Sequence, residues 1–432
     1  MHESVWSATA SMPHFPSLKG SHKTDVLIIG GGLCGVLCAH FLAERGVDYI
    51  LCEGAALGSG TTKNTTAKVT AQHGLMYADL LAREGKEAAQ LYYNANMEAI
   101  GLYRKLSQSI RCDFEDKSAY TYSLKNREEL LREAEAVCRI GGQADVVETP
   151  LLPFPTMGAV RFPAQGQFHP LKFLAGLSKG LRIYENTPIK SINGNTAFSP
   201  HGKIRAEKMI VTTHFPFLNM HGSYFLKLYQ SRSYILALTD AQNVDGMYRD
   251  ADDKGLSFRN WQNYLLLGGG SHRTGKKSDG WASLRTQVLE SYPAAKEKYA
   301  FAAQDCISLD GRPYIGHYAK TTPSLYVATG FNKWGMTGSM VAARMLSAQL
   351  TGQKTPYDAL FSPSRSIVKP QLFVNGAESA INLLTPTKKR CPHLGCALKW
   401  NPAEHSWDCP CHGSRFSETG ALIDNPATDD LP

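Results

Sequence analysis

The pattern of apolar and polar positions predicts an α/β protein with a second, strand-rich part. Residues 25–29 form a short apolar run typical of a buried parallel strand, and an apolar helical segment follows directly. Residues 86–107 and 126–140 carry apolar side chains at helical spacing, which predicts two helices that cover the core. Residues 228–238 and 264–267 instead resemble strands, and the second run leads into three glycines that we expect to end it.

The composition excludes several classes of protein. At roughly 150 residues per domain, 432 residues predict two to three domains, and a hydrophobic content of 43% is enough to fill ordinary cores. The net charge of +8, from 46 Lys and Arg against 38 Asp and Glu, is spread thinly and forms no stripe for nucleic acid. Because the chain has no run of 18 apolar residues and residues 1–16 lack a signal-peptide pattern, we expect no membrane span and a cytoplasmic location.

A glycine motif follows the first predicted strand and opens the first predicted helix. Gly30 allows the tight turn, Gly32 lets the backbone approach a pyrophosphate, and Gly35 lets the helix pack closely on the strand. A second strand over residues 47–52 ends at Glu53, which lies 23 residues beyond Gly30, where a carboxylate can bind the hydroxyl groups of a ribose. The full context of strand, turn, helix, strand and acid predicts a dinucleotide site.

Three further segments carry a resemblance to a known family. They are 60–74 (Gly-Thr-Thr-Lys-Asn-Thr-Thr-Ala-Lys-Val-Thr-Ala-Gln-His-Gly), 308–316 (Ser-Leu-Asp-Gly-Arg-Pro-Tyr-Ile-Gly) and 328–337 (Ala-Thr-Gly-Phe-Asn-Lys-Trp-Gly-Met-Thr). They resemble FAD-dependent amine and amino-acid oxidoreductases of the D-amino-acid oxidase (DAO) superfamily, and the likeness covers most of residues 24–355. The resemblance implies that the dinucleotide is FAD, which the glycine motif alone does not separate from NAD.

The resemblance also implies which residues hold the flavin. In that superfamily, a glycine-rich turn before the last helix points backbone N–H groups at the pyrimidine edge of the flavin, where a helix amino terminus stabilises the negative charge of the reduced ring. Residues 330–337 would form this turn. Besides the glycine motif and Glu53, the expected cofactor-binding residues are Thr61, Thr66, Ala67, Lys68, Ile189, Gly330, Gly335, Met336 and Thr337.

The implied fold class is α/β, with a Rossmann-like FAD-binding domain, an inserted antiparallel-sheet substrate domain and a small carboxyl-terminal all-β domain. The expected boundaries are 1–85, 156–215 and 305–355 for the FAD-binding domain, 86–155 and 216–304 for the substrate domain, 356–388 for a linker and 389–432 for the last domain.

No acid–base pair stands out by spacing, so the catalytic residues stay unassigned. Polar groups at strand ends next to flexible glycines commonly face ligands, although a solvated surface position is an equally open interpretation for each. The residues in such places are Arg232, Arg259, His272 and Arg273. Lys333 lies in the turn of residues 330–337, and the alternative to a catalytic role is that it is a surface cation. Of these, Arg259, His272 and Lys333 are the catalytic candidates.

One position bears on the substrate. Many amino-acid oxidases of this superfamily carry an arginine that clamps the substrate carboxylate five residues before the Asp-Gly of the 308–316 segment. Here that position is Asp305. Because bidentate recognition of a carboxylate needs a guanidinium group, an acid at this place favours a substrate that bears an amine.

The carboxyl-terminal segment contains a second, more specific motif. Cys391-Pro-His393 is followed, after 15 residues, by Cys409-Pro-Cys411-His412. Two thiolates and two imidazoles on two loops suit a 2Fe-2S centre with cysteines on one iron and histidines on the other. The segment resembles a Rieske domain with Cys391, His393, Cys409 and His412 as ligands. In Rieske domains of this pattern a disulfide joins the positions of Cys396 and Cys411. The alternative is a structural zinc site, because Cys2His2 is also a zinc ligand set.

This segment departs from the Rieske pattern in two ways. Respiratory Rieske proteins have a tyrosine where this chain has Phe416, and the loss of that hydroxyl predicts a potential below the high end of the class. Residues 371–390 are also too short for the usual base sheet, and so small a domain needs a metal or a neighbour to stay folded. We therefore expect it to dock on the flavoprotein body, with its histidine edge near the flavin or an outside electron partner.

The combined features predict a flavin dehydrogenase that oxidises a C–N bond of a small amine or amino-acid-like substrate. Its electrons would pass to the Rieske cluster and then to an external electron acceptor, because the cluster takes single electrons at a potential above that of all-cysteine clusters. Two alternatives stay open: a redox sensor or electron-transfer module without its own small-molecule substrate, and a flavin oxidase with a structural zinc tail.

Overall fold

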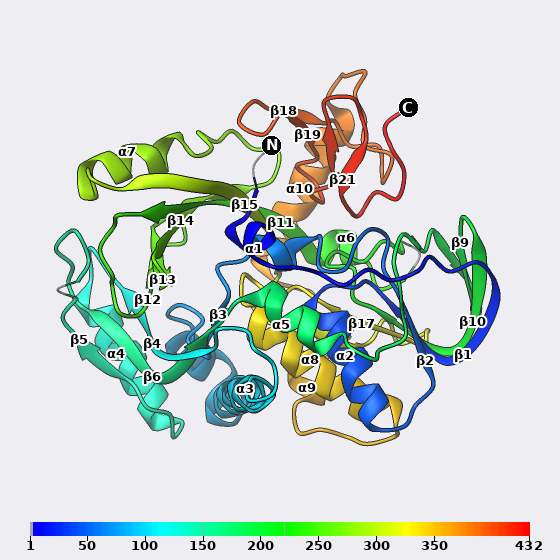
Figure 1. Cartoon of the computed structure of the whole chain (residues 1–432), viewed down its shortest axis with the longest axis horizontal. Coiled ribbons are helices and arrows are strands. Elements are labelled where there is room, and N and C mark those ends of the chain that lie inside the picture. The colour runs from blue at the N-terminus through cyan, green and yellow to red at the C-terminus, as the bar shows by residue number, and fades with distance from the viewer. Residues whose placement is uncertain (1–2, 150, 220) are drawn as a thin grey trace.

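The computed structural model describes residues 3–149, 151–219 and 221–432, and it divides the strands among three sheets (Figure 1). The helices are α1 (Val5–Thr9), α2 (Leu33–Glu44), the 3-10 helix η1 (Thr61–Asn64), α3 (Tyr77–Leu106), α4 (Arg127–Arg139), α5 (Pro170–Leu177), α6 (Tyr224–Lys227), α7 (Ala282–Ser291), α8 (Gly335–Leu350), α9 (Asp358–Phe361) and α10 (Pro370–Leu384). No helix among the described residues is long and apolar enough to cross a membrane.

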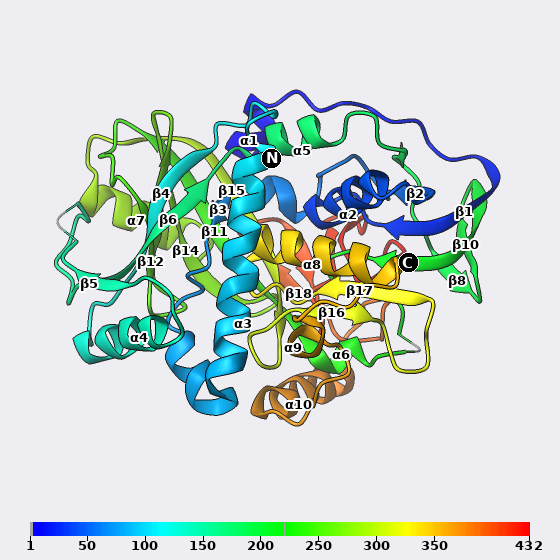
Figure 2. The same cartoon turned by 90° about the horizontal axis from the view of Figure 1, so that it is seen from below.

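The first sheet is the predicted nucleotide-binding sheet. Its strands are β1 (Gly20–Ile29), β2 (Tyr49–Cys52), β7 (Ile183–Tyr184), β8 (Ser191–Asn193), β9 (Thr196–Ser199), β10 (Gly202–Val211), β16 (Tyr314–His317) and β17 (Leu325–Thr329). The order is β16-β17-β10-β1-β2-β7, and the four pairings from β17 to β7 are parallel, as Rossmann-like topology requires. Helices α2 and α8 pack against each other beside this sheet (Figure 2).

The second sheet is mostly antiparallel. Its strands are β3 (Lys68–Val69), β4 (Glu115–Tyr122), β5 (Asp145–Val147), β6 (Ala159–Gln167), β11 (Leu228–Thr239), β12 (Met247–Asp250), β13 (Ser257–Trp261), β14 (Tyr264–Arg273) and β15 (Lys296–Ser308). The order is β15-β11-β14-β13-β12-β4-β6-β3, with β5 beside β6 and one parallel pair, β12 with β4. Contrary to expectation, β14 continues through its three glycines. At Gly268 and Gly269, neighbouring side chains lie within 3.0 Å of where a Cβ would stand, so glycine keeps the strand in the sheet.

The structure differs from the expected boundaries at three places. Strand β6, placed by expectation in the FAD-binding domain, pairs with β4 in the second sheet. The expected linker 356–388 contains helices α9 and α10, and the apolar side chains of α10, such as Phe373 and Ile381, repeat at helical spacing but face solvent. Ile189 lies between β7 and β8 and not in a strand.

The third sheet is a small antiparallel meander near the carboxyl terminus. Its strands are β18 (Lys399–Asn401), β19 (Ser406–Asp408), β20 (Arg415–Ser417) and β21 (Leu422–Asp424). It lies beside α10 and the ends of β11 and β15 (red in Figure 1). Its core holds few side chains: Cys391, Cys396, Leu398, Cys409, Cys411, Phe416 and Ala427. So small a core gives little stability by itself, so contacts with the body matter.

Candidate functional site

The glycine turn joins the ends of β1 and β10 to the start of α2. Gly30 has a φ of 112°, and a Cβ there would lie 2.8 Å from Thr212 O. A Cβ on Gly35 would lie 1.9 Å from Gly30 O, so α2 can approach the strand this closely only with glycine at that position. The first N–H groups of α2, which have no acceptor within the helix, therefore lie at the carboxyl end of the sheet.

Glu53 lies beside this turn, at the end of β2. Its Oε2 accepts a hydrogen bond from Gly31 N (2.6 Å) and its Oε1 from Ala55 N (2.8 Å). Burial raises the pKa of Glu53, although these backbone N–H groups act to lower it. Thr187 N donates to Glu53 O (2.8 Å), which brings the loop of Ile189 to the same place. The structure thus gathers the predicted glycine, acid and Ile189 positions.

The segment with the predicted flavin contacts runs from this turn to the second sheet. Thr62 Oγ1 accepts from Leu33 N (3.1 Å), which attaches η1 to the start of α2. Thr61 Oγ1 donates to Gln304 O (3.2 Å) on β15, the strand that also carries Asp305. The segment therefore connects the nucleotide sheet to the second sheet.

Arg259 on β13 holds the middle of this segment. Its Nη1 donates to Thr66 O (2.8 Å) and Ala67 O (2.9 Å), and Ala67 adopts a left-handed φ of 52°. Burial lowers the pKa of Arg259 to about 9, and its Nε and Nη2 have no hydrogen-bond partner among the described residues. The neighbouring Lys68 is half-buried, with its Nζ donating to Tyr248 O (2.6 Å), and desolvation lowers its pKa well below the usual range. Two basic side chains thus lie side by side.

The late turn prepares the amino terminus of α8. Asn332 and Lys333 both have left-handed φ values, 52° and 71°, and α8 begins at Gly335. The N–H groups of its first residues, Gly335, Met336 and Thr337, have no acceptor within the helix. Thr337 Oγ1 donates to Thr70 O (3.2 Å), so the turn and the 61–74 segment meet.

The three catalytic candidates do not form one cluster. Lys333 Nζ donates to Ser271 Oγ and lies near Asp305, whose pKa burial raises to about 6 while Lys333 acts to lower it. Burial lowers the pKa of Lys333 itself. Arg259 belongs to the 61–68 segment, whereas His272 stacks on Tyr234 at a centroid distance of 5.7 Å and lies toward the third sheet, among charges that include Arg232 and Glu404.

The two predicted histidine ligands face each other. The Nδ1 atoms of His393 and His412 lie 3.2 Å apart. On the far side of each ring, Nε2 lies 2.7 Å from Asn219 Oδ1 for His393 and 3.0 Å from Phe225 O for His412. Since both partners are acceptors, each Nε2 carries the hydrogen and each Nδ1 keeps its lone pair. Burial lowers the pKa of His393 to about 3 and lowers that of His412, so both rings are neutral, as metal ligands must be.

The cysteines of the two loops gather beside these rings. Cys391 and Cys409 are 2% and 0% exposed, and hydrogen bonds from the thiols of Cys391, Cys396 and Cys411 hold the pKa of Cys409 well below its usual range. The sulfur atoms of Cys396, Cys409 and Cys411 lie within 4.8 Å of one another, so this trio is a second set that could hold a metal. Cys396 and Cys411 are free thiols, and their disulfide stays a prediction.

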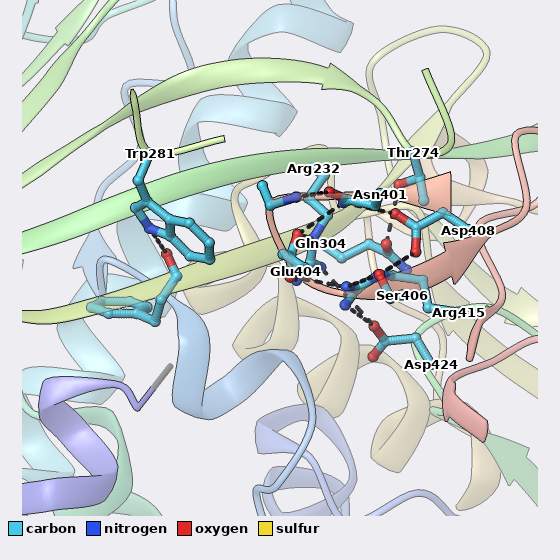
Figure 3. A network of polar contacts seen from close by, with 12 residues as sticks. Arg232, Thr274, Trp281, Gln304, Asn401, Glu404, Ser406, Asp408, Arg415 and Asp424 are labelled. Carbon is cyan, nitrogen blue, oxygen red and sulfur yellow. Dashed lines mark hydrogen bonds and ion pairs between the residues drawn. The ribbon is translucent and has the colours of Figure 1, made fainter. Parts of the chain in front are cut away.

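A buried ionic network joins the third sheet to the second (Figure 3). Arg232 on β11 forms a two-point ion pair with Glu404, and Arg415 donates to Glu404 (2.9 Å), Asp408 (3.0 Å) and Asp424 (3.1 Å). The side chains of Arg232 and Glu404 are only 6% and 9% exposed. Arg232, expected at a substrate pocket, therefore serves the contact between the sheets, because its strand position faces the tail. Arg273 does so too, donating to Pro410 O and Cys411 O.

These features define a redox protein of two parts, a dinucleotide-binding body and a tail with a thiol and imidazole cluster. The chain belongs to the DAO family of FAD-dependent oxidoreductases, whose family model matches residues 25–349, and the Rieske [2Fe-2S] domain model matches residues 373–432. Its cofactors are accordingly FAD and a 2Fe-2S cluster.

Individual relatives agree with both parts. Over 496 aligned residues the chain is 32% identical to YhfW of Bacillus subtilis (strain 168), a protein named as a Rieske 2Fe-2S iron-sulfur protein, covering 99% of this chain and 97% of that protein. The tail is 54% identical over 37 residues to the cytochrome b6-f complex iron-sulfur subunit of Nostoc punctiforme, or 9% of this chain and 21% of that subunit. The structure of glycine oxidase from Geobacillus kaustophilus shares the fold, with a TM-score of 0.69, 20% identity and coverage of 80% of this chain and 100% of that chain.

The residues present fit both cofactors. The glycine turn has no room for a Cβ at Gly30 or Gly35, so strand, turn and helix pack as closely as a dinucleotide-binding motif requires. Two neutral imidazoles with facing lone pairs, next to two buried thiols, match the donor set of a 2Fe-2S centre with mixed ligands.

Several residues at these sites carried no signal in the sequence. Asn219 and Phe225 O hold the histidine rings, and Asn425 Nδ2 donates to Phe215 O (2.7 Å) from the tail side. Gln230 and Gln304 also contact the tail. The one available signal was on β11, where Gln230 and Arg232 place polar groups on one face of an otherwise apolar strand.

Proposed function

We propose that this chain is an FAD-dependent dehydrogenase that oxidises a C–N bond of a small amine or amino-acid-like substrate and passes the electrons to its own Rieske cluster. An external electron acceptor then takes them from the cluster. When bound, FAD supplies a two-electron acceptor and the cluster a one-electron carrier.

The observation that carries the proposal is that the rings of the two histidine ligands face the body of the protein. Both Nε2 atoms donate to the segment between β10 and β11, at Asn219 and Phe225 O. The ring of Phe215, on the same segment, lies 5.9 Å from that of His412. Since this segment connects the two sheets of the body, the histidine edge lies against the flavoprotein rather than in solvent, which supports electron transfer within the chain.

The chain's own residues have the following proposed roles. Gly30, Gly32, Gly35 and Glu53 bind the adenine dinucleotide part, and the start of α8 at Gly335–Thr337 faces the flavin with free N–H groups. Arg259 and Lys68 hold the 66–68 segment, and the positive charge of Arg259 there favours a reduced, anionic ring. The ligands of the cluster are Cys391, His393, Cys409 and His412.

The substrate class rests on Asp305 and on the fold. An acid stands where a carboxylate clamp would need a guanidinium group, and Lys333 and Ser271 line the same place. Glycine oxidase, and L-proline dehydrogenase from P. horikoshii with a TM-score of 0.67 at 17% identity over 80% of this chain and 98% of that chain, share this fold. Both names refer to substrates with a C–N bond, which agrees with amine oxidation.

The test is anaerobic titration of the holoprotein with amines and with amino acids, followed by visible and low-temperature EPR spectra. We expect amines to bleach the flavin and to produce the EPR signal of a reduced Rieske cluster. The variant Cys391→Ser should lose the EPR signal and keep the flavin bleaching, while the exposed Cys138→Ser serves as control. Bleaching by amino acids alone would exclude the amine substrate, and flavin with zinc instead of iron would exclude the relay.

A further inference from the structure

The second cluster loop, residues 409–414, rests on the second sheet of the flavoprotein. Four successive carbonyl groups of this loop accept hydrogen bonds from three side chains of that sheet. The pairs are Arg273 Nε to Pro410 O (2.9 Å), Arg273 Nη2 to Cys411 O (3.1 Å), Gln230 Nε2 to His412 O (2.9 Å) and Gln304 Nε2 to Gly413 O (2.9 Å).

Two of the three donors, Gln304 and Arg273, are themselves held in place. Gln230 and Gln304 are 1% and 5% exposed, and Thr274 Oγ1 donates to Gln304 Oε1 (3.1 Å), which orients the amide so that its nitrogen faces the loop (Figure 3 shows Thr274 beside Gln304). Arg273 Nη1 donates to Asn375 Oδ1 on α10 (3.0 Å), and its guanidinium lies 4.8 Å from the ring centre of Tyr229. These contacts orient Gln304 and Arg273 toward the carbonyl groups of the loop.

The loop and the sheet approach each other without room for further side chains. Gly413 has a φ of 84°, and a Cβ there would lie 2.6 Å from Gln230 Cβ. On the sheet side, a Cβ on Gly275 would lie 2.7 Å from Pro410 N. Glycine therefore stands at both faces of the contact, and the backbone of the loop meets the sheet directly.

We propose that Arg273, Gln230 and Gln304 are positioning residues for the iron–sulfur cluster, and that the flavoprotein sheet takes the place of the base sheet that the tail lacks. Residues 370–384, ahead of the first ligand, form helix α10 and supply no supporting strand. The body instead sets the shape of the loop that carries Cys409 and His412. The Arg273 cation adds a second effect, since positive charge beside the loop favours the reduced cluster. The proposal needs no particular substrate and no electron flow from the flavin.

The first test removes the amide donors without changing charge. We expect the double variant Gln230→Leu/Gln304→Leu to bind the cluster about 10- to 100-fold more weakly, as is typical for residues that support metal ligands, while its FAD content stays equal to that of the wild type. The readouts are iron per flavin in the purified holoprotein and the g-values of the dithionite-reduced cluster. Gln287→Leu, a half-buried glutamine on α7 away from the tail, is the matched control.

The second test separates position from charge at Arg273. Arg273→Lys keeps the positive charge but cannot donate to two carbonyl groups in the same fork geometry. Arg273→Met removes both the charge and the hydrogen bonds. We expect altered g-values in both variants and, in a redox titration followed by EPR, a lower midpoint potential in Arg273→Met than in Arg273→Lys.

Two results would overturn the proposal. One is full iron with unchanged g-values in the double glutamine variant. The other is parallel loss of FAD and iron, which would indicate general unfolding. If substrate did not reduce the cluster, that result would count against the proposed function. The iron content and the g-values would still test the roles of the three positioning residues.

Discussion

Gly35 shows how one missing side chain permits the dinucleotide site. A methyl group there would lie 1.9 Å from Gly30 O, and backbone on both sides would have to move. We predict that Gly35→Ala destabilises the protein by about 1–3 kcal/mol and lowers FAD retention. Gly101→Ala is the control, since Gly101 lies in α3 with open space around its Cβ position, and it should be neutral or stabilising by up to about 1 kcal/mol. Thermal melts with and without added FAD, and bound FAD after gel filtration, measure both effects.

Asp310 illustrates a buried acid that depends on its partners. Burial acts to raise its pKa, but the ion pairs with Arg365 (2.7 Å) and Arg312 (3.0 Å) prevail and lower the pKa to about 2. Because the pKa in the folded state lies below that of an unfolded aspartate, near 3.9, the ionised group stabilises the fold above pH 4, and this contribution is lost as the pH falls toward 2.

We therefore predict that Asp310→Asn lowers the free energy of unfolding by about 2 kcal/mol at pH 7, and that the difference from wild type narrows at pH 3. Urea denaturation at both pH values measures it. The exposed pair of Asp116 with Arg104 supplies the control, Asp116→Asn, for which we expect a change below about 1 kcal/mol. A pH-independent difference for Asp310→Asn would contradict the assignment.

Among the elements, α10 reverses the usual arrangement of an amphipathic helix. Its buried residues are Asn375 and Asn382, while Ile381 is 62% exposed and Phe373 69% exposed. Asn375 Nδ2 donates to Leu226 O (3.1 Å), and its Oδ1 accepts from Arg273. Polar contacts, and not apolar burial, thus attach this helix to the body.

The buried polar face and the exposed apolar face of α10 lead to two predictions. Asn375→Leu should cost about 1–3 kcal/mol, because it leaves a half-buried carbonyl and a half-buried guanidinium nitrogen without these partners. Ile381→Lys should change stability by less than about 0.5 kcal/mol, because that side chain faces solvent. Chemical denaturation of the two variants tests the assignment of the faces, and the opposite ranking would refute it.

At the scale of the whole molecule, the tail and the body form one unit. Glu404 from the tail pairs with Arg232 from the body, and although burial acts to raise the pKa of Glu404, the two arginines around it lower that pKa to about 2. Together with the contacts of residues 409–414, this network attaches the third sheet to the body. The tail is therefore expected to resist release from the body.

We predict that limited proteolysis of the wild-type holoprotein releases no stable cluster fragment. Glu404→Gln removes one charge and leaves buried arginines uncompensated, which should cost about 3–5 kcal/mol and expose the segment between α10 and β18 to cleavage. Glu418→Gln, at an exposed glutamate in the turn between β20 and β21, should behave as wild type. Release of an intact iron-containing fragment from the wild type would show that the tail stands alone.

The sequence by itself determined the features that are formed by residues close together in the chain. The strand, glycine turn and helix at residues 25–44, the acid at Glu53 and the two cluster loops each depend on residues close in the chain, where a turn or ligand geometry demands a particular residue type. These predictions were confirmed at the level of fold and cofactor. Strands β11 and β14 followed from their composition in the same way.

Only the tertiary structure decided which distant groups meet. Gln230 and His412 are 182 positions apart, and Arg232 and Glu404 are 172 apart. Such pairs leave no periodic trace, because a polar side chain on a strand looks the same whether water, substrate or another sheet satisfies it. Because the tail packs on the body, Arg232 and Arg273 lie at a contact between sheets, and the histidine ligands face the body. The expected linker contains helix α10.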